Sequence, residues 1–538
     1  MQIVHRKLPN SGYNSGAISR ARPLPQVHHN HKALCCTRGS GHAREEASPD
    51  KQGIPVTAAL PSTTLRNVLT ALMLAIFLGA LDQTIVAVSL PAISAQFNDV
   101  GLLAWVISGY MVAMTVAVPI YGKLGDLYGR RRMILTGISL FTLASIACAL
   151  AQDMQQLVLA RVLQGIGAGG MVSVSQAIIG DFVPPRERGR YQGYFSSMYA
   201  VASVAGPVLG GWLTEYLSWR WVFWINLPLG LVALWAIRRA LGGMPAQRRE
   251  AQVDYLGAVL LILGLGSLLL GISLVGQGHA WADPPVLALF ACAALGLVLF
   301  VAHERRCREP LLPLGLFGNR VAVLCWGVIF FASFQSISLT MLMPLRYQGI
   351  TGAGADSAAL HLLPLVMGLP MGAFTGGRMT SLTGRYKPQI LAGALLMPLA
   401  IFAMALTPPQ SALPSALFML LTGIACGLQF PTSLVGTQSA VDSKDIGVAT
   451  STTNLFRSLG GAMGVACMSS LLLALLHQGG FESLGNPLLG SLKAGEVDLV
   501  TQGRLLETFR QLLMGSALIA LLGLLAAVAL PDRQLRGR

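Results

Sequence analysis

Residues 122–132 have the sequence GKLGDLYGRRR, and this short polar stretch between two apolar segments decides the fold. Its glycines permit a tight backbone reversal, and its cations hold it in water at the cytoplasmic face of a membrane. Residues 377–387 repeat the pattern as GRMTSLTGRYK. The aligned pairs are Gly122 and Gly377, Gly129 and Gly384, Arg130 and Arg385, and Arg132 and Lys387, with Ser381 in place of Asp126. Two ordinary basic turns are the alternative, but the glycine and cation spacings match together, so the repeat favours two homologous halves.

The composition is that of a membrane protein. The chain of 538 residues is 53% hydrophobic and only 11% charged, with a mean hydropathy of +0.61, whereas a soluble protein would carry about a quarter charged residues. The net charge of +15 does not indicate nucleic-acid binding, because the cations gather at the ends of apolar segments and in the N-terminal tail. The eight cysteines show no disulfide or zinc-ligand spacing, so we expect no metal and no cofactor.

Apolar segments long enough to cross a bilayer, each of about 20 residues, follow one another from Leu65 onward. Lys and Arg are concentrated in alternate loops, which predicts that both termini face the cytoplasm. The fourteen predicted spans are 66–90, 102–121, 133–151, 156–179, 191–213, 220–240, 255–276, 285–303, 320–343, 357–376, 388–407, 412–432, 446–476 and 510–530.

The repeated stretches join spans 2 and 3 and spans 10 and 11, which makes span 10 the counterpart of span 2. Two halves of six helices then comprise spans 1–6 and 9–14, and spans 7 and 8 form an inserted pair. The predicted domains are a disordered basic tail over 1–62, a first six-helix bundle over 63–243, the inserted helix pair over 244–310, a second six-helix bundle over 311–532 and a C-terminal tail over 533–538.

Three polar residues inside the predicted spans are candidates for ion coupling. Asp82 lies within span 1, where an unpaired charge would cost several kcal/mol, so it suits a proton carrier or a counter-ion for a cationic substrate. Arg161 lies within span 4, with Gln164 one turn later on the same face, and its field would act on Asp82. The alternatives are a structural carboxylate and an arginine that reaches the cytoplasmic interface. A dry, permanent ion pair, or a side chain facing lipid, would contradict the carrier role.

Small residues recur at four-residue spacing on four of the spans. Such stripes let helices approach closely, and prolines loosen the backbone, so two helices from each half would suit a rocking interface. Static packing would use the same residues. The stripes are Gly109, Ala113 and Ala117 on span 2, Ala202, Gly206 and Gly210 with Pro207 on span 5, Gly368, Gly372 and Gly376 with Pro364 and Pro370 on span 10, and Gly460 and Gly464 on span 13.

The remaining polar features favour no catalytic function. His361 could titrate at the start of span 10, but a hydrated interfacial histidine is the simpler interpretation. Nucleotide-binding, zinc-protease and catalytic-triad signatures are absent from the sequence, so an enzyme is not predicted and transport would depend on an ion gradient or downhill flow. The tail could hold a metal only through His28, His29, His31, Cys35 and Cys36, and disorder is the simpler interpretation there.

Over residues 65–530 the chain resembles the major facilitator superfamily, specifically its fourteen-helix drug–proton antiporter branch. The stretch 122–132 is similar to the superfamily's signature loop. Residues 81–91 and 161–165 resemble the branch's motifs in spans 1 and 4, although Ala87 replaces the usual asparagine. Residues 206–211 resemble its antiporter motif, with Ala202 where a glycine is usual, and 219–228 resemble a stretch typical of the branch.

The resemblance implies two six-helix bundles around a cavity that opens to one face at a time, with the extra pair between them. It also implies a cytoplasmic gate in which Asp126 accepts a hydrogen bond from the start of span 13 and pairs with Arg130. Asp181, at the end of span 4, is a plausible second partner for Arg130. The gating residues are Gly122, Asp126, Gly129, Arg130, Arg131 and Asp181.

These features together predict an inner-membrane exporter that exchanges protons for amphipathic, cationic compounds by alternating access. A proton-coupled metabolite exporter or symporter on the same fold is the first alternative, and a membrane-embedded enzyme or receptor is the second. The predicted partners are a small-molecule substrate, protons and the lipid bilayer, with no nucleic acid, and a periplasmic adaptor protein is left open.

Overall fold

The computed structural model describes residues 62–97, 102–242, 254–307, 309–351, 355–478 and 499–535, and nearly all of them lie in helices. Residues 1–61 of the predicted tail, with its histidines and cysteines, lie outside this description. The long helices are α1 (Ser62–Phe97), α2 (Leu103–Tyr128), α3 (Arg130–Leu150), α4 (Met154–Phe182), α5 (Pro185–Tyr216), α7 (Asn226–Ala240), α8 (Tyr255–Gly276), α9 (Pro284–Glu304), α10 (Arg320–Thr351), α11 (Ala355–Thr383), α12 (Lys387–Leu406), α13 (Ala412–Ala440), α14 (Ile446–Gln478) and α15 (Leu499–Ala529). Short elements are α6 (Trp221–Trp224), η1 (Leu314–Gly318) and η2 (Ser443–Asp445).

Thirteen helices among the described residues are long and apolar enough to cross a membrane. α5 is the predicted span that falls short, because glycine, serine, tyrosine and charged residues fill much of its first half. Helices satisfy their own backbone hydrogen bonds, which is the requirement for crossing hydrocarbon. The prediction of an all-α polytopic membrane fold is therefore confirmed.

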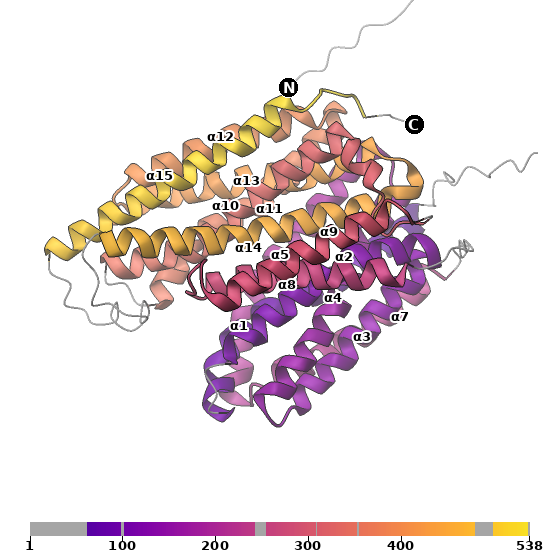
Figure 1. The fold of residues 1–538 in the computed structure, drawn as a ribbon, viewed down its shortest axis with the longest axis horizontal. Coiled ribbons are helices and arrows are strands. Elements are labelled where there is room, and N and C mark those ends of the chain that lie inside the picture. The colour runs from indigo at the N-terminus through magenta and orange to yellow at the C-terminus, as the bar shows by residue number, and fades with distance from the viewer. Residues whose placement is uncertain are drawn as a thin grey trace, which may run out of the picture. The chain divides into compact units, whose positions relative to one another are not determined.

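The helix packing repeats between the two halves of the chain (Figure 1). In the first half α1 packs on α5 and α7, and α4 packs on α2 and α3. In the second half α10 packs on α14 and α15, and α13 packs on α11 and α12. Each pair of the first set therefore has its counterpart in the second, which is the two-bundle arrangement expected of an internal repeat.

The two bundles meet through α5 against α11 and through α2 against α14. These two contacts are also counterparts of each other, so the interface has the same repeat as the bundles. The inserted helices α8 and α9 pack on one another as a hairpin, and α8 also contacts α2 and α14. The exact boundaries of the predicted domains remain a prediction.

The repeated stretch is more helical than the sequence suggested. α2 continues through Gly122 and Gly125 to Tyr128, and the reversal is made by Gly129 alone, at a φ of 90°. In the second copy α11 continues to Thr383, and Gly384 turns the chain at a φ of 67°. Positive φ strains any residue with a Cβ, so the third glycine of the stretch serves the turn while the other two serve close packing.

Candidate functional site

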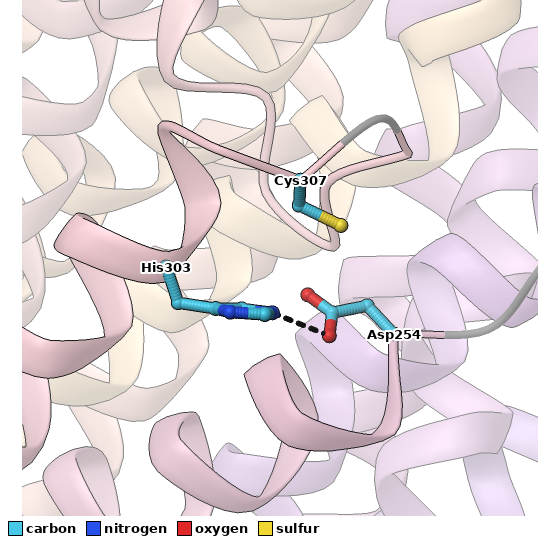
Figure 2. A group of neighbouring side chains, drawn as sticks. All are labelled: Asp254, His303 and Cys307. Atoms are coloured by element: carbon cyan, nitrogen blue, oxygen red, sulfur yellow. Dashed lines mark hydrogen bonds and ion pairs between the residues drawn. The ribbon is translucent and has the colours of Figure 1, made fainter.

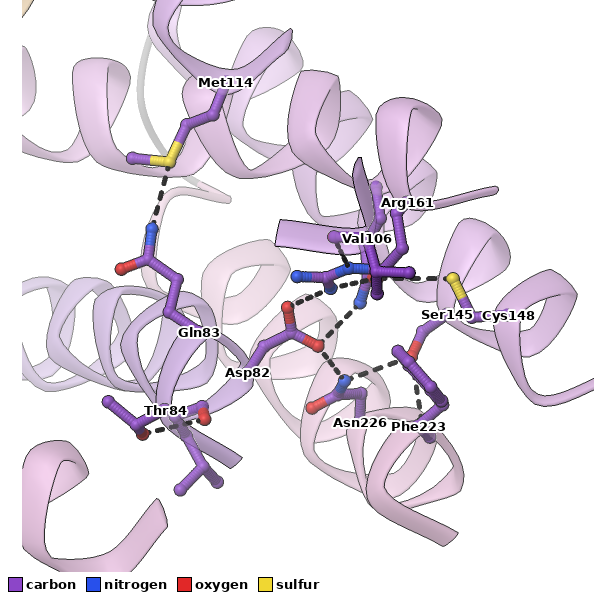
Figure 3. Close-up of polar contacts among 12 residues, drawn as sticks. Asp82, Gln83, Thr84, Val106, Met114, Ser145, Cys148, Arg161, Phe223 and Asn226 are labelled. Carbon is purple, nitrogen blue, oxygen red and sulfur yellow. Dashed lines mark hydrogen bonds and ion pairs between the residues drawn. The ribbon is translucent and has the colours of Figure 1, made fainter. Parts of the chain in front are cut away.

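Asp82, on α1, is the centre of a buried polar network in the first bundle (Figure 3). Its Oδ2 lies 2.6 Å from Nη1 of Arg161 on α4. Its Oδ1 accepts hydrogen bonds from Nε2 of Gln164 and from Nδ2 of Asn226, each at 2.8 Å. The side chain of Asp82 is 0% exposed and that of Arg161 is 2% exposed, so this is a fully desolvated ion pair with two further donors to the carboxylate.

Arg161 has partners other than Asp82. Its Nη1 also donates to Oε1 of Gln164 at 2.7 Å, and its Nε donates to the carbonyl oxygen of Val106 at 3.2 Å. Its guanidinium carbon lies 4.1 Å from the centre of the Tyr110 ring, within the range of a cation–π contact. The arginine therefore points into the bundle rather than reaching the interface, and its charge is held by a carboxylate, two oxygens and an aromatic face.

Asn226 is a member of this network that the sequence analysis did not single out. It begins α7, and its Nδ2 also donates to Oγ of Ser145 at 3.0 Å, while its Oδ1 is buried and accepts no hydrogen bond from the part of the chain that the structure describes. The available signal was an amide in the apolar segment 220–240, inside the stretch 219–228 that carries part of the resemblance. Without knowing that α1 and α7 pack together, an amide alone could not be assigned to Asp82.

In this conformation Asp82 is thus a buried, ion-paired carboxylate that faces neighbouring helices and not lipid. The carrier role of Asp82 therefore stays a prediction, and it now requires that Arg161 release the carboxylate during transport.

A second ionic cluster joins the gating residues. Arg130 forms an ion pair with Asp126 one turn earlier, and its Nε donates to Oδ2 of Asp181 at 2.9 Å. The Arg130 and Asp126 side chains are 12% and 11% exposed. Arg131, by contrast, is exposed, and no contact of it is described. The structure thus brings together Asp126, Arg130 and Asp181 but not Arg131.

The gating cluster lies against the first turn of α14, in the other bundle. A Cβ at Gly447 would approach Oδ1 of Asp126 to 2.5 Å, and the backbone of Val448 is a hydrogen-bond partner of that carboxylate. A Cβ at Gly122 would meet the side chain of Ser451 and, at 3.0 Å, the carbonyl oxygen of Gly447. A carboxylate at a helix N-terminus is favourable because the first backbone N–H groups lack partners within the helix.

Further polar contacts join the bundles near the same end. Asn454 on α14 donates to Oε1 of Gln176 on α4 at 2.6 Å, and Gln438 on α13 donates to the backbone oxygen of Gln176 at 3.3 Å. Arg186, at the start of α5, donates at 3.0 Å to the backbone oxygens of Ser381 and Leu382. The bundles are therefore tied together by side chains at the end that carries the two repeated stretches.

The small-residue stripes face inside the bundles, which differs from the expected interface role. A Cβ at Gly206 or Gly210 would meet Thr84 or Ile85 of α1 in the same bundle. Pro207, beside them, is exposed. The stripe on α11 faces α13 in the second bundle, and its residues Gly368, Gly372 and Gly376 would meet Leu420, Ile424 and Leu428. Glycines on one face of a helix pack against a single neighbouring helix, which here lies in the same bundle. A different face of α5 and α11 contacts the opposite bundle.

Other glycines of α5 and α11, nearer to the start of α5 and the end of α11, lie between the bundles. A Cβ at Gly189 of α5 would approach the backbone oxygen of Gly377 on α11 to 2.7 Å, and a Cβ at Gly193 would approach Phe374 to 3.0 Å. Gly377 is the second-half counterpart of Gly122, so the first glycine of each repeated stretch lies at the bundle interface. His361 lies elsewhere on α11, with its ring 4.5 Å from that of Tyr347.

Two repeated bundles of helices long and apolar enough to cross a membrane, with buried charges in the first, are an arrangement typical of a membrane transporter. The model of the Major Facilitator Superfamily matches residues 72–465, and the chain belongs to this superfamily. It is a multi-pass membrane protein. The predicted resemblance is confirmed.

Relatives and a solved structure support this assignment. Over 407 residues the chain is 35% identical to the multidrug transporter protein MdtP of Bacillus subtilis (strain 168), covering 76% of this chain and 75% of the relative. It is 30% identical over 416 residues to multidrug resistance protein 3 of the same organism, covering 77% and 81%. The human organic anion transporter MFSD10 has the same fold, with a TM-score of 0.60 at 16% identity over 86% of this chain and 99% of that one.

Proposed function

We propose that this protein exports amphipathic, cationic compounds across the cell membrane in exchange for protons, by alternating access of its two bundles. The names of the multidrug relatives support the substrate class. The observation that carries the proposal is the buried pair of Asp82 and Arg161, in which the arginine has other partners besides the carboxylate.

Protonation of Asp82 would not strand Arg161. Once Asp82 is neutral the ion pair is lost, yet Oε1 of Gln164, the carbonyl oxygen of Val106 and the ring of Tyr110 still hold the guanidinium. An arginine left with no acceptor in an apolar bundle would be far more costly. The network therefore supports two protonation states with a modest difference in hydrogen bonding.

A proton on Asp82 would also find an acceptor. Oδ1 of Asn226 is buried without a donor, and Nδ2 of the same amide already lies 2.8 Å from the carboxylate. Rotation of the amide exchanges these two atoms, so Asn226 can donate to the ionised carboxylate and accept from the neutral acid. Proton and cationic substrate then compete for Asp82, and binding of one releases the other.

The cluster of Asp126, Arg130 and Asp181 serves as the gate in this scheme. It holds the start of α14 against α2 and α4, so its release would separate the bundles at that end. The charges of the loops orient the protein with this end and both termini in the cytoplasm. The membrane in this proposal is the inner membrane of the cell. The conformation described here is then closed on the cytoplasmic side.

Counterflow of protons and substrate is the direct test. Purified protein in liposomes that carry an internal pH indicator is supplied with ethidium, an amphipathic aromatic cation, under an imposed pH gradient. Antiport predicts that ethidium movement carries protons in the opposite direction, and a symporter reverses that sign. An Asp82→Asn variant should lose proton-coupled movement while remaining inserted and folded.

Asp153→Asn is the matched control, because Asp153 is an exposed residue that caps the start of α4 through the backbone N–H of Gln156, outside the network. It should transport as the wild type does. Unaltered proton-driven efflux in Asp82→Asn would refute the carrier role and leave the ion pair as a structural contact. A protein that moves no probe in any condition would revive the enzyme or receptor alternative.

A further inference from the structure

Outside the transport network, three side chains with metal-binding atoms converge at one end of the inserted α8–α9 hairpin (Figure 2). Asp254 immediately precedes α8, His303 lies in the last turn of α9, and Cys307 follows that helix. The candidate ligand atoms all lie within 4.8 Å of one another. Nε2 of His303 is 2.8 Å from Oδ1 of Asp254.

The Asp254 carboxylate is buried, and its helix-capping role accounts for only one of its two oxygens. Its side chain is 5% exposed, and Oδ1 caps α8 by accepting from the backbone N–H of Gly257 at 2.8 Å. Oδ2 is buried and accepts no hydrogen bond of standard geometry from the described residues, and the Cys307 thiol is the side chain with which Asp254 interacts on that side. Figure 2 shows this second oxygen on the side that faces Cys307. Buried carboxylate oxygens are normally satisfied by good donors, so an oxygen that faces only a weakly donating thiol, on a carboxylate bound to an imidazole, suits a cation ligand.

A second buried carboxyl group lies near Asp254. Glu304, next to His303, is 4% exposed and interacts electrostatically with Asp254. Its Oε1 accepts from the backbone N–H groups of Leu311 and Leu312, while its Oε2 is buried without a donor. A cation bound at Asp254 would also reduce the repulsion between these two carboxylates.

The donor set selects the kind of ion. A thiolate sulfur, an imidazole nitrogen and a carboxylate oxygen are the ligands of Zn²⁺ and similar borderline metals, whereas Mg²⁺ and Ca²⁺ take oxygen alone. We infer that Asp254, His303 and Cys307 form a binding site for Zn²⁺ that fastens the start of α8 to the end of α9. The remaining coordination position is left to water, as in zinc sites with three protein ligands.

This site is separate from transport. It lies on the inserted hairpin, and none of its three residues contacts the Asp82 network or the gating cluster in the described structure. The sequence places His303 and Cys307 four residues apart, but Asp254 stands 49 residues before His303, so spacing alone does not predict the three-residue site. Only the pairing of α8 with α9 completes the set.

Metal titration of the full-length protein tests the inference. Purified protein is stripped with a chelator and titrated with Zn²⁺ by calorimetry, then with Co²⁺, which reports thiolate ligands by an intense near-ultraviolet charge-transfer band. The variants are Asp254→Asn, His303→Ala and Cys307→Ser. His279→Ala is the matched control, since His279 pairs with Asp283 at 3.2 Å at the opposite, exposed end of the same hairpin.

We expect each ligand variant to lose one equivalent of Zn²⁺, or to bind it at least about tenfold more weakly, while His279→Ala binds as the wild type does. Any equivalents bound by the N-terminal histidines and cysteines are common to all proteins and cancel. Relative to the wild type, Cys307→Ser should lose the part of the cobalt–thiolate band that Cys307 contributes, and its serine is not expected to disturb either helix. Unchanged stoichiometry and affinity in all three variants would overturn the site, and a loss confined to Cys307→Ser would overturn the three-ligand assignment.

Discussion

The two bundles share one packing scheme but distribute charge differently. In the first bundle the buried cation Arg161 faces the carboxylate of Asp82. In the second bundle the buried cation Arg346 donates, among the described residues, to the backbone oxygens of Met404 and Thr407 and to no carboxylate. Helices α10 and α15, which correspond to α1 and α7 with their contact between Asp82 and Asn226, are joined by a neutral contact in which Gln335 on α10 donates to the backbone oxygen of Ser516 at 2.8 Å.

The repeated stretches differ in the same way. Asp126 in the first copy binds Arg130 and the start of α14, but the second copy has Ser381, whose backbone oxygen is held by Arg186 from the first bundle. Arg385, the counterpart of Arg130, pairs with Asp532 at 3.5 Å on the exposed surface. The two halves thus share their helix packing and the first and last glycine of the stretch, whereas the buried Arg–Asp pairs among the described residues lie in the first half.

The largest expected effect is on the buried pair. Arg161→Met should lower the free energy of unfolding by about 3–5 kcal/mol, because it leaves Asp82 as an unpaired charge in an apolar bundle. Arg346→Met removes a cation that has no acid partner, and it should cost clearly less. Thermal unfolding of both variants in the same detergent measures the difference.

Adding Asp82→Asn to Arg161→Met should restore part of the lost stability, since it removes the stranded charge. Equal unfolding midpoints for the Arg161 and Arg346 variants, or no recovery in the double variant, would contradict the claim that the buried arginine of the first bundle depends on an acid partner.

The second effect concerns the two copies of the stretch. Arg130→Gln removes hydrogen bonds to two carboxylates, each worth about 1.5–3 kcal/mol, so ethidium efflux in liposomes should fall roughly tenfold or more. Arg385→Gln breaks an exposed pair worth about 0–1 kcal/mol and should leave efflux within a factor of about two. A large loss in Arg385→Gln would mean that both copies act as gates.

Much of this architecture could be predicted from sequence, because apolar runs and loop charges depend on local composition alone. The helices, the inserted pair and the convergence of Asp126, Arg130 and Asp181 followed from span counting and the resemblance. Asn226 and the direction of the Gly206 stripe did not, since both depend on which face of a helix meets α1. The helical course of residues 122–128 was also missed, because glycines in a polar stretch are equally typical of a turn and of close helix packing.

The smallest expected effect is the difference in stability between alanine substitutions at Gly122 and Gly377, the first glycines of the two copies. A Cβ at Gly377 would collide with the backbone oxygen of Gly189, whereas one at Gly122 would first meet the side chain of Ser451. Gly377→Ala should therefore cost about 1–3 kcal/mol, because two helix backbones must separate, and Gly122→Ala should cost less. Both substitutions gain the same helix propensity of up to about 1 kcal/mol, so the difference in unfolding midpoint isolates the contact.

Combining Gly122→Ala with Ser451→Gly should recover most of the smaller loss. No equivalent rescue exists for Gly377→Ala, because the atom in its way belongs to the main chain of Gly189. If the two alanine variants lose the same stability and Ser451→Gly rescues nothing, the bundles do not meet at these glycines as described.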